Sequence, residues 1–189
     1  MSIRPSPWKT LSSRIIYENP WIKLREDQVV APSGAQGIYS VVESRVAVGV
    51  LAFDSSGDIY LVGQYRYPTQ CYSWEIPEGG ADHGEDPLHA AQRELREETG
   101  IVAKQWEPLG GELHLSNCFT AERGLLFTAS ELSFAERNLD PTEEIAVKKV
   151  SFVEALEMVR EGIITDALSV IAILRFDLER RLCAQVKPA

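Results

Sequence analysis

Short runs of β-branched and aromatic residues, interrupted by polar positions and turn signals, fill the first part of the chain. Residues 10–31 read as extended segments and stop at the turn-forming run "PSGAQG". A second group follows at 38–54 and 59–67, separated by the turn "SSGD". The pattern predicts a succession of neighbouring strands.

The pattern changes to a helical period after "WEIPEGG". Asp86-Pro87 is a favourable start for a helix, because aspartate caps the first turn and proline suits the first helical position. Gly100 is a natural stop, so we expect a helix over 87–99. Its apolar stripe should consist of Leu88, Ala91, Leu95 and Thr99.

Further strands are expected at 107–115, 124–134 and 145–152, and two helices should finish the chain. Ser151 with Glu154 forms a plausible capping box for the first helix, and Thr165 is the expected cap of the second. Runs of strands with three separated helices predict an α+β fold, with a mixed sheet and helices packed outside. We expect residues 1–44 to form an N-terminal antiparallel strand unit and residues 45–189 to form the main domain.

Composition limits the classes of function. The chain has 189 residues, a formal net charge of −9 and three scattered cysteines. The negative charge argues against a nucleic-acid partner and favours cationic ones, metal ions included. The first residues lack the apolar run of a signal peptide, and no stretch has membrane-spanning length. We therefore expect a cytoplasmic protein with reduced thiols and no membrane partner.

Negative charge is crowded in the stretch "QRELREETG". On a helix, Glu94 and Glu98 are an i,i+4 like-charge pair with Glu97 nearby, and such pairs cost about 0.2–0.5 kcal/mol each. The helical period places them on a polar arc away from the apolar stripe. A solvated acidic face would explain that arc. A glycine-rich loop directly upstream instead favours a ligand or metal site. This loop leads into a helix N-terminus, and its glycines allow the backbone to approach a ligand closely.

Loop and helix together read Gly79-x5-Glu85-x7-Arg93-Glu94-Leu95-x-Glu97-Glu98-x-Gly100-Ile101. This arrangement resembles the signature box of the Nudix hydrolases, with every specified position filled. The resemblance implies a Nudix α/β/α sandwich and a divalent cation held against a substrate diphosphate. Magnesium is the expected ion, with manganese as a substitute, because Mg²⁺ prefers carboxylate and phosphate oxygens.

The same resemblance assigns roles within the box. It implies that Glu94, Glu97 and Glu98 are the metal cluster, joined by a backbone carbonyl near Glu78 or Gly79. Glu85 would bind metal more loosely or through water. Arg93 would orient the glutamates by charge-assisted hydrogen bonds.

Other stretches resemble the branch that hydrolyses ADP-ribose and nucleoside diphosphate sugars. In that branch the N-terminal strands build a homodimer and supply part of the neighbour's nucleotide pocket. Arg66 in "GQYRYP" matches an arginine that contacts phosphate, although a surface ion pair explains it equally well. Trp21 is a candidate for stacking on a base or for anchoring an interface. Glu122 is a candidate for assisting the site or for a salt bridge.

The loop "LDPTEEIAV" resembles the one that carries a further metal ligand and, in some members, the water-activating base. Glu143 matches the ligand best, Glu144 is the acidic alternative, and Asp140 is a more distant one. A polar hairpin tip is the alternative reading of this loop.

One position departs from the pattern of ADP-ribose-specific members. They commonly carry a proline about sixteen residues past the box, whereas this chain has Asn117 in "LSNCF". GDP-mannose, ADP-glucose and UDP-sugars therefore stay open beside ADP-ribose. We predict hydrolysis of a nucleotide sugar to a nucleoside monophosphate and a sugar phosphate. The alternatives are a pyrophosphohydrolase acting on nucleoside triphosphates and a catalytically silent nucleotide-sugar sensor.

Overall fold

The computed structural model describes residues 5–139 and 144–186. Its chain divides into two compact units, one made of residues up to 45 together with 114–123, and one made of 46–113 with 124 onward. The predicted boundary between a strand unit over 1–44 and a hydrolase domain over 45–189 stays a prediction. Within the described ranges, no helix is long and apolar enough to cross a membrane.

The first unit is a three-stranded antiparallel sheet. Its strands, in spatial order, are β1 (Lys9–Glu18), β2 (Ile22–Val30) and β3 (Gln36–Ser44). The segment 114–123 joins this unit through backbone hydrogen bonds between Val42 and both Phe119 and Ala121. The Tyr39 hydroxyl also donates to the carbonyl oxygen of Cys118 at 2.7 Å.

The second unit contains two sheets and the helices. Its strands are β4 (Ala47–Ala52), β5 (Asp58–Arg66), β6 (Cys71–Glu75), β7 (Glu78–Gly80), β8 (Ile101–Pro108), β9 (Leu113–His114), β10 (Arg123–Phe134) and β11 (Ala146–Ser151). One sheet has the order β7-β4-β10-β8 and is mixed, because β4 and β10 run parallel while the other neighbours are antiparallel. The other, β11-β5-β6, is antiparallel.

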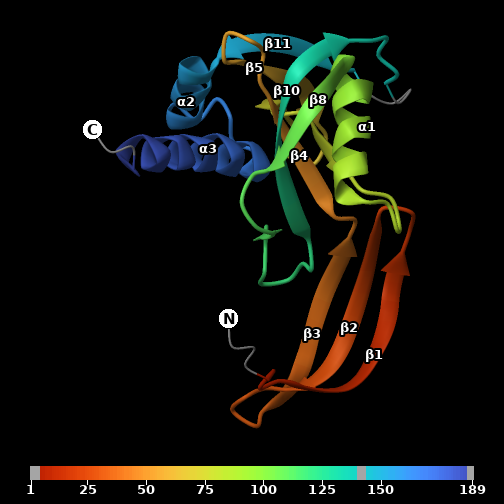
Figure 1. Cartoon of the computed structure of the whole chain (residues 1–189). Helices are drawn as coiled ribbons and strands as arrows, with labels where there is room; N and C mark the ends of the chain where they lie inside the picture. Colours follow the sequence, from red (N-terminus) through yellow and green to blue (C-terminus); the bar gives the residue numbers. More distant parts are fainter. Residues whose placement is uncertain (1–4, 140–143, 187–189) are drawn as a thin grey trace. The chain divides into compact units, whose positions relative to one another are not determined.

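Helices cover both faces of the mixed sheet. These are α1 (Pro87–Thr99), α2 (Phe152–Arg160) and α3 (Ala167–Val186). Helix α1 packs on one side of β4, whereas α3, with α2 beside it, lies on the other (Figure 1). The predicted α+β class, with its mixed sheet between helices, is confirmed.

Most of the expected element boundaries hold, and one strand does not. The range predicted for the first helix matches α1. The strand predicted over 107–115 is wrong, because β8 already begins at Ile101 and only the two-residue β9 lies near its end. Strand β8 starts directly after the C-cap Gly100 and pairs along its length with β10. Strand β8 therefore depends on this long-range pairing, and no local sequence pattern predicted it.

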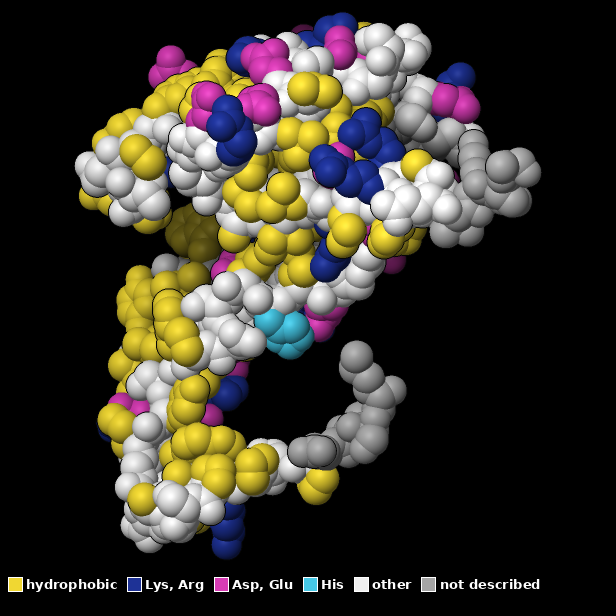
Figure 2. Space-filling view, turned by 90° about the vertical axis from the view of Figure 1, so that its left-hand side faces the viewer, with side chains coloured by type: hydrophobic (Ala, Val, Ile, Leu, Met, Phe, Trp, Pro, Cys, Tyr) yellow, Lys and Arg dark blue, Asp and Glu magenta, His cyan; other side chains and the backbone are white. Residues whose placement is uncertain are grey.

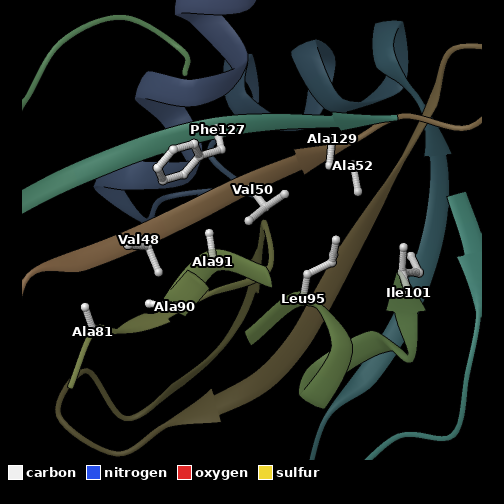
Figure 3. Close-up of a cluster of buried hydrophobic side chains, with 10 residues drawn as sticks. All are labelled: Val48, Val50, Ala52, Ala81, Ala90, Ala91, Leu95, Ile101, Phe127 and Ala129. Carbon is white, nitrogen blue, oxygen red and sulfur yellow. The ribbon is translucent and has the colours of Figure 1, made fainter. Parts of the chain in front are cut away.

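The core that holds α1 against the sheet is mostly aliphatic (Figure 3). It is formed by buried side chains from the helix, from the two parallel strands and from the segments that flank the helix: Val48, Val50, Ala52, Ala81, Ala90, Ala91, Leu95, Ile101, Phe127 and Ala129. The alanines allow close approach of helix and sheet, which fixes the depth of α1 and the position of its glutamates.

Candidate active site

The rotation of α1 is set by its ends. The Asp86 carboxylate accepts hydrogen bonds from the amides of Leu88, at 2.9 Å, and His89, at 3.2 Å. At the other end, Gly100 adopts a left-handed conformation with φ 73° and donates its amide to the carbonyl of Arg96. Both predicted end signals are confirmed. They fix which side chains face the neighbouring loop.

Arg93 is the centre of the ion pairs on this helix. Its guanidinium donates to both oxygens of Glu85, at 3.1 and 3.0 Å, and to the carbonyl of Gly80 at 3.1 Å. It also donates to Glu94 at 2.8 Å and to Glu97 at 3.1 Å. Hydrogen bonding to Glu85 raises the pKa of Arg93, and the return interaction lowers the pKa of Glu85 to about 2. The planar guanidinium of Arg93 thus aligns the carboxylates of Glu85, Glu94 and Glu97.

Glu98 does not lie on a solvated face, which was the alternative to a metal site that helical periodicity left open. Its residue surface is only 3% exposed. The backbone amide of Glu78 donates to Glu98 Oε2 at 3.1 Å, which places strand β7 over this carboxylate. Helical periodicity places glutamate on the polar side of a helix and carries no information on a distant segment that covers it. An acidic surface turned to solvent therefore does not describe Glu98.

The glycine that opens the box is required by close packing. A Cβ built on Gly79 would lie 2.2 Å from Cδ of Glu94 and 2.3 and 2.6 Å from its two carboxylate oxygens. Gly79 belongs to β7 and pairs with Val48 on β4, so its backbone cannot easily retreat. The missing side chain therefore makes room for the Glu94 carboxylate beside the backbone of the loop.

Arg66, at the end of β5, is bound to acidic neighbours. Its Nε donates to both oxygens of the buried Glu75 at 3.0 Å, and its Nη2 contacts Glu75 again and donates to Glu78 at 3.0 Å. Burial works to lower the pKa of Arg66, but the interactions with Glu75 outweigh it and raise that pKa. The structure thus displays an ion pair at Arg66, and the phosphate contact stays a prediction.

Glu78 contributes more than the backbone carbonyl that the sequence indicated. Its carboxyl is buried, and Oε1 accepts a hydrogen bond from Arg66. Burial raises the pKa of Glu78 well above its ordinary value, and the neighbouring charges of Asp166 and Glu75, together with a hydrogen bond between the carboxyl groups of Glu78 and Asp166, raise it further. The side chains of Glu75 and Asp166 are therefore part of the local chemistry, and sequence reasoning missed both.

Asp166 also corrects the predicted cap of the last helix. Its Oδ2 accepts a hydrogen bond from the amide of Ser169 at 2.7 Å, so Asp166 caps α3 in place of Thr165. The Ser151 hydroxyl caps α2 by accepting from the Glu154 amide, as expected. Asp166 lies 88 positions beyond Glu78 in the chain, and no spacing in the sequence could have linked them.

The remaining predicted site residues belong to the first unit or to the segment before β11. Trp21, which is exposed, belongs to the first unit together with the exposed Asn117 and the half-buried Glu122. Glu144 is exposed, and the predicted ligand Glu143, with its alternative Asp140, lies outside the described residues. The functional roles of all these residues stay predictions.

A divalent cation fits the chemistry of the box. Glu94 and Glu98 offer carboxylate oxygens beside strand β7, Glu94 against the backbone of Gly79 and Glu98 at the amide of Glu78. In the described residues, no three His, Cys, Asp or Glu side chains stand in a ready metal-binding arrangement. Glu94 and Glu97 instead point to Arg93, so binding an ion requires rotation of these side chains.

A cavity borders helix α1. It has a volume of about 780 Å³ and is shared by α1, β8 and the segment after β10. Arg93 and Glu97 reach it, together with Trp106, Arg96 and Arg137. An indole and guanidinium groups suit an aromatic or anionic ligand, and no motif in the sequence indicated that these residues meet.

Comparison with known proteins identifies the architecture. The NUDIX domain model matches residues 43–167, which is more than half of the chain. The chain belongs to the Nudix family. A second model, the nucleoside diphosphate sugar hydrolase N-terminal domain, matches residues 8–42. The constellation around Arg93 is thus the Nudix box of this protein.

Nudix relatives align over nearly the full length. An ADP-ribose pyrophosphatase of Bacillus subtilis is 35% identical over 94% of this chain and 96% of its own. One from Mycobacterium tuberculosis is 32% identical over 96% and 88%. A methanol dehydrogenase activator of Bacillus methanolicus is 35% identical over 92% and 95%. A crystal structure of an ADP compounds hydrolase shares the fold, with a TM-score of 0.81 at 18% identity, over 99% of this chain and 100% of that one.

Proposed function

We propose that this Nudix protein hydrolyses the diphosphate linkage of nucleoside diphosphate sugars, releasing a nucleoside monophosphate and a sugar phosphate. The observation that carries the proposal is the complete carboxylate set around Arg93, held beside the buried Glu98. The match of 8–42 to a nucleoside diphosphate sugar hydrolase N-terminal domain supports the branch. Two full-length relatives named ADP-ribose pyrophosphatases agree with it.

The chain's own residues have separable tasks in this reaction. Glu94, Glu97 and Glu98 would hold a divalent cation, for which we propose Mg²⁺. When bound, the ion neutralises charge on the diphosphate and lowers the pKa of coordinated water. Arg93 keeps the carboxylates in position, because its fork bonds three of them at once. Arg66 can turn from Glu78 to a phosphate oxygen, since guanidinium binds both anions in the same geometry.

The leaving groups can be deduced from the bond that breaks. Water adds its oxygen to one phosphorus, and the bond from that phosphorus to the bridging oxygen breaks. Both products then carry a phosphate monoester. A carboxylate that accepts the water's proton completes the step, and we propose that it comes from the acidic loop with Glu143 and Glu144, which the family resemblance links to this task.

We propose that the substrate range extends beyond ADP-ribose. Asn117 occupies the position where ADP-ribose-specific members commonly carry proline, and its exposed amide can donate and accept hydrogen bonds. ADP-glucose, GDP-mannose and UDP-sugars are therefore candidates beside ADP-ribose. Nucleoside triphosphates are the competing substrate class.

We further propose that two copies of the chain associate through the N-terminal sheet. Large apolar side chains are exposed on its strands and at their ends: Trp8, Leu11, Ile15, Ile16, Tyr17, Trp21, Ile22 and Ile38. Hydrophobic side chains reach the surface of this sheet in Figure 2. Strand β1 is also an edge strand, with unpaired backbone groups that suit pairing with another chain.

The experiment for the reaction is a substrate panel. The purified full-length protein is incubated with Mg²⁺ and, separately, with ADP-ribose, ADP-glucose, GDP-mannose, UDP-glucose and the common nucleoside triphosphates. We expect kcat/KM to be higher for at least one nucleotide sugar than for every triphosphate. A preference for a triphosphate, with release of pyrophosphate, would contradict the substrate class and leave the Nudix chemistry standing.

The experiment for association is light scattering. We expect a dimer mass at micromolar concentration, and a variant lacking residues 1–44 should be monomeric or unstable. A monomer mass for the full-length chain contradicts the proposed association.

A further inference from the structure

A cavity of about 780 Å³ lies between helix α1, the edge strand β8 and the segment that follows β10. Helix α1 and strand β8 are neighbours in the fold (Figure 1). The volume is within the range of roughly 300–1,000 Å³ that is typical of pockets for small molecules. Arg96, which lines the cavity, lies about 160° round the helix axis from Glu98. The cavity therefore borders a different face of α1 from the one whose buried carboxylate bonds to β7.

The lining carries a surplus of positive charge. Among the residues that the structure describes, no carboxylate pairs with the guanidinium of Arg96 or with that of Arg137, which donates to a backbone carbonyl at 3.0 Å. Arg93 is the third positive group, and the carboxylates in the lining are Glu97 and the exposed Glu136. Three positive groups against two negative ones favour an anion here, although the whole chain has a net charge of −9.

Trp106 supplies an aromatic surface to the same cavity. This residue is half-buried and packs in part against the core that holds α1. Its Nε1 donates to the carbonyl of Ala103 at 3.1 Å, so the indole has no further N–H to offer a ligand. What it offers is ring surface, which suits a flat aromatic group such as a nucleobase, because stacking on an aromatic side chain tolerates any base.

Arg93 connects this cavity with the Nudix box. Its Nη1 donates to Glu94 at 2.8 Å and to Glu97 at 3.1 Å, and Glu97 also borders the cavity. When these carboxylates turn towards a divalent cation, Nη1 loses both acceptors. A phosphate in the cavity replaces them, because guanidinium bonds phosphate and carboxylate in the same geometry. Binding in the cavity and binding of the cation should therefore favour each other, and such coupling is reciprocal.

We propose that this cavity is a regulatory site for a nucleoside monophosphate, whose base stacks on Trp106 and whose phosphate is bound by Arg96 and Arg137. A nucleoside monophosphate combines the flat ring and the anionic group that these residues bind. The choice of this ligand rests on the proposed function, because the proposed hydrolysis releases it. The alternative role of Arg96 is to stabilise the negative C-terminal end of α1, in whose last turn it lies.

The indole N–H signals of the ¹⁵N-labelled full-length protein test the site directly, with AMP as the probe and no metal present. The chain has four tryptophans, and a Trp106→Leu variant identifies the signal of Trp106. We expect AMP to shift this signal in a saturable way. Adenosine and inorganic phosphate should each bind at least about 10-fold more weakly, because each makes only part of the contacts. Shifts confined to the other tryptophans, or phosphate binding as tight as that of AMP, overturn the site.

A charge variant separates binding from a structural role. Arg96→Gln keeps a long side chain that suits a helix and removes the charge. It should raise the Kd for AMP, followed at the Trp106 signal, by about 10-fold and leave KM for a nucleotide sugar unchanged. Lys104→Gln is the matched control, because it removes one positive charge from an exposed position of β8 outside the lining, and it should keep the wild-type Kd. A lower melting temperature of Arg96→Gln with an unchanged Kd shows the helix-end role and contradicts the proposal.

The same titration in saturating Mg²⁺ tests the coupling through Arg93. The Kd for AMP should fall about 5-fold or more, and an unchanged or higher Kd overturns the regulatory role. The outcomes also separate this site from the proposed function. If AMP shifts the Trp106 signal while no nucleotide sugar is cleaved, the proposed hydrolysis fails and the site stands. If nucleotide sugars are cleaved and AMP leaves the Trp106 signal in place, the site fails and the hydrolysis stands.

Discussion

Replacing Gly79 by alanine should remove most of the activity while leaving the fold nearly intact. The added Cβ would lie 2.2 Å from Cδ of Glu94, whereas ordinary contact begins at 3.4 Å. The Glu94 carboxylate must therefore move by about 1.2 Å, and a misplacement of about 1 Å in a catalytic group can cost roughly 100-fold in rate. The carboxylate is the far end of a flexible side chain, so its displacement costs little stability.

The assay measures kcat/KM for a cleaved nucleotide sugar over a range of Mg²⁺ concentrations, together with the melting temperature. We expect kcat/KM to fall by about 100-fold, a higher Mg²⁺ requirement, and a melting temperature within about 3 °C of wild type. Gly111→Ala is the matched control, because nothing lies within 4 Å of its added Cβ. Wild-type rate and metal dependence in Gly79→Ala would refute the idea that this glycine makes room for a working carboxylate.

Three further predictions address the same box. Glu98→Gln keeps an acceptor for the Glu78 amide, so the fold should persist while kcat falls by about 100-fold or more and the Mg²⁺ requirement rises; unchanged kinetics would return this residue to a structural role. Arg93→Lys cannot bond three carboxylates at once, and we expect kcat/KM to fall by about 10- to 100-fold; a lysine variant as active as wild type would show that the fork is dispensable. The folded-state pKa of Glu85 is lowered from 4.5 to about 2, so its stabilising effect is present above pH 4.5 and is lost as pH falls toward 2. Denaturant titrations should accordingly show a stability deficit of Glu85→Gln that shrinks over that window, and a deficit independent of pH would contradict the ion pair with Arg93.

Local signals predicted the helix that carries the chemistry. Asp86-Pro87 and Gly100 act within one turn of the chain, and the structure places the ends of α1 at these residues. The family assignment also followed from local spacing, since the box lies within 23 consecutive residues. The α+β class followed from the alternation of strand-like and helix-like runs.

Long-range contacts could not be read from spacing. The burial of Glu98 depends on the amide of Glu78, twenty positions earlier on another element. The relation of Glu78 to Asp166 depends on the packing of α3 near β7, and the start of β8 depends on pairing with β10. Each of these features is created by tertiary structure, where a polar residue can be buried once a partner from elsewhere is supplied.

The central claim is that water attacks a phosphorus atom of a nucleotide sugar. Its most direct test is hydrolysis in ¹⁸O-labelled water, followed by separation of the products and measurement of their masses by mass spectrometry. The full-length protein with Mg²⁺ and a cleaved nucleotide sugar should yield a nucleoside monophosphate and a sugar phosphate, with one ¹⁸O atom in a phosphate group of one product. Release of a nucleoside diphosphate and a free sugar labelled at carbon would contradict attack at phosphorus and, with it, the proposed function.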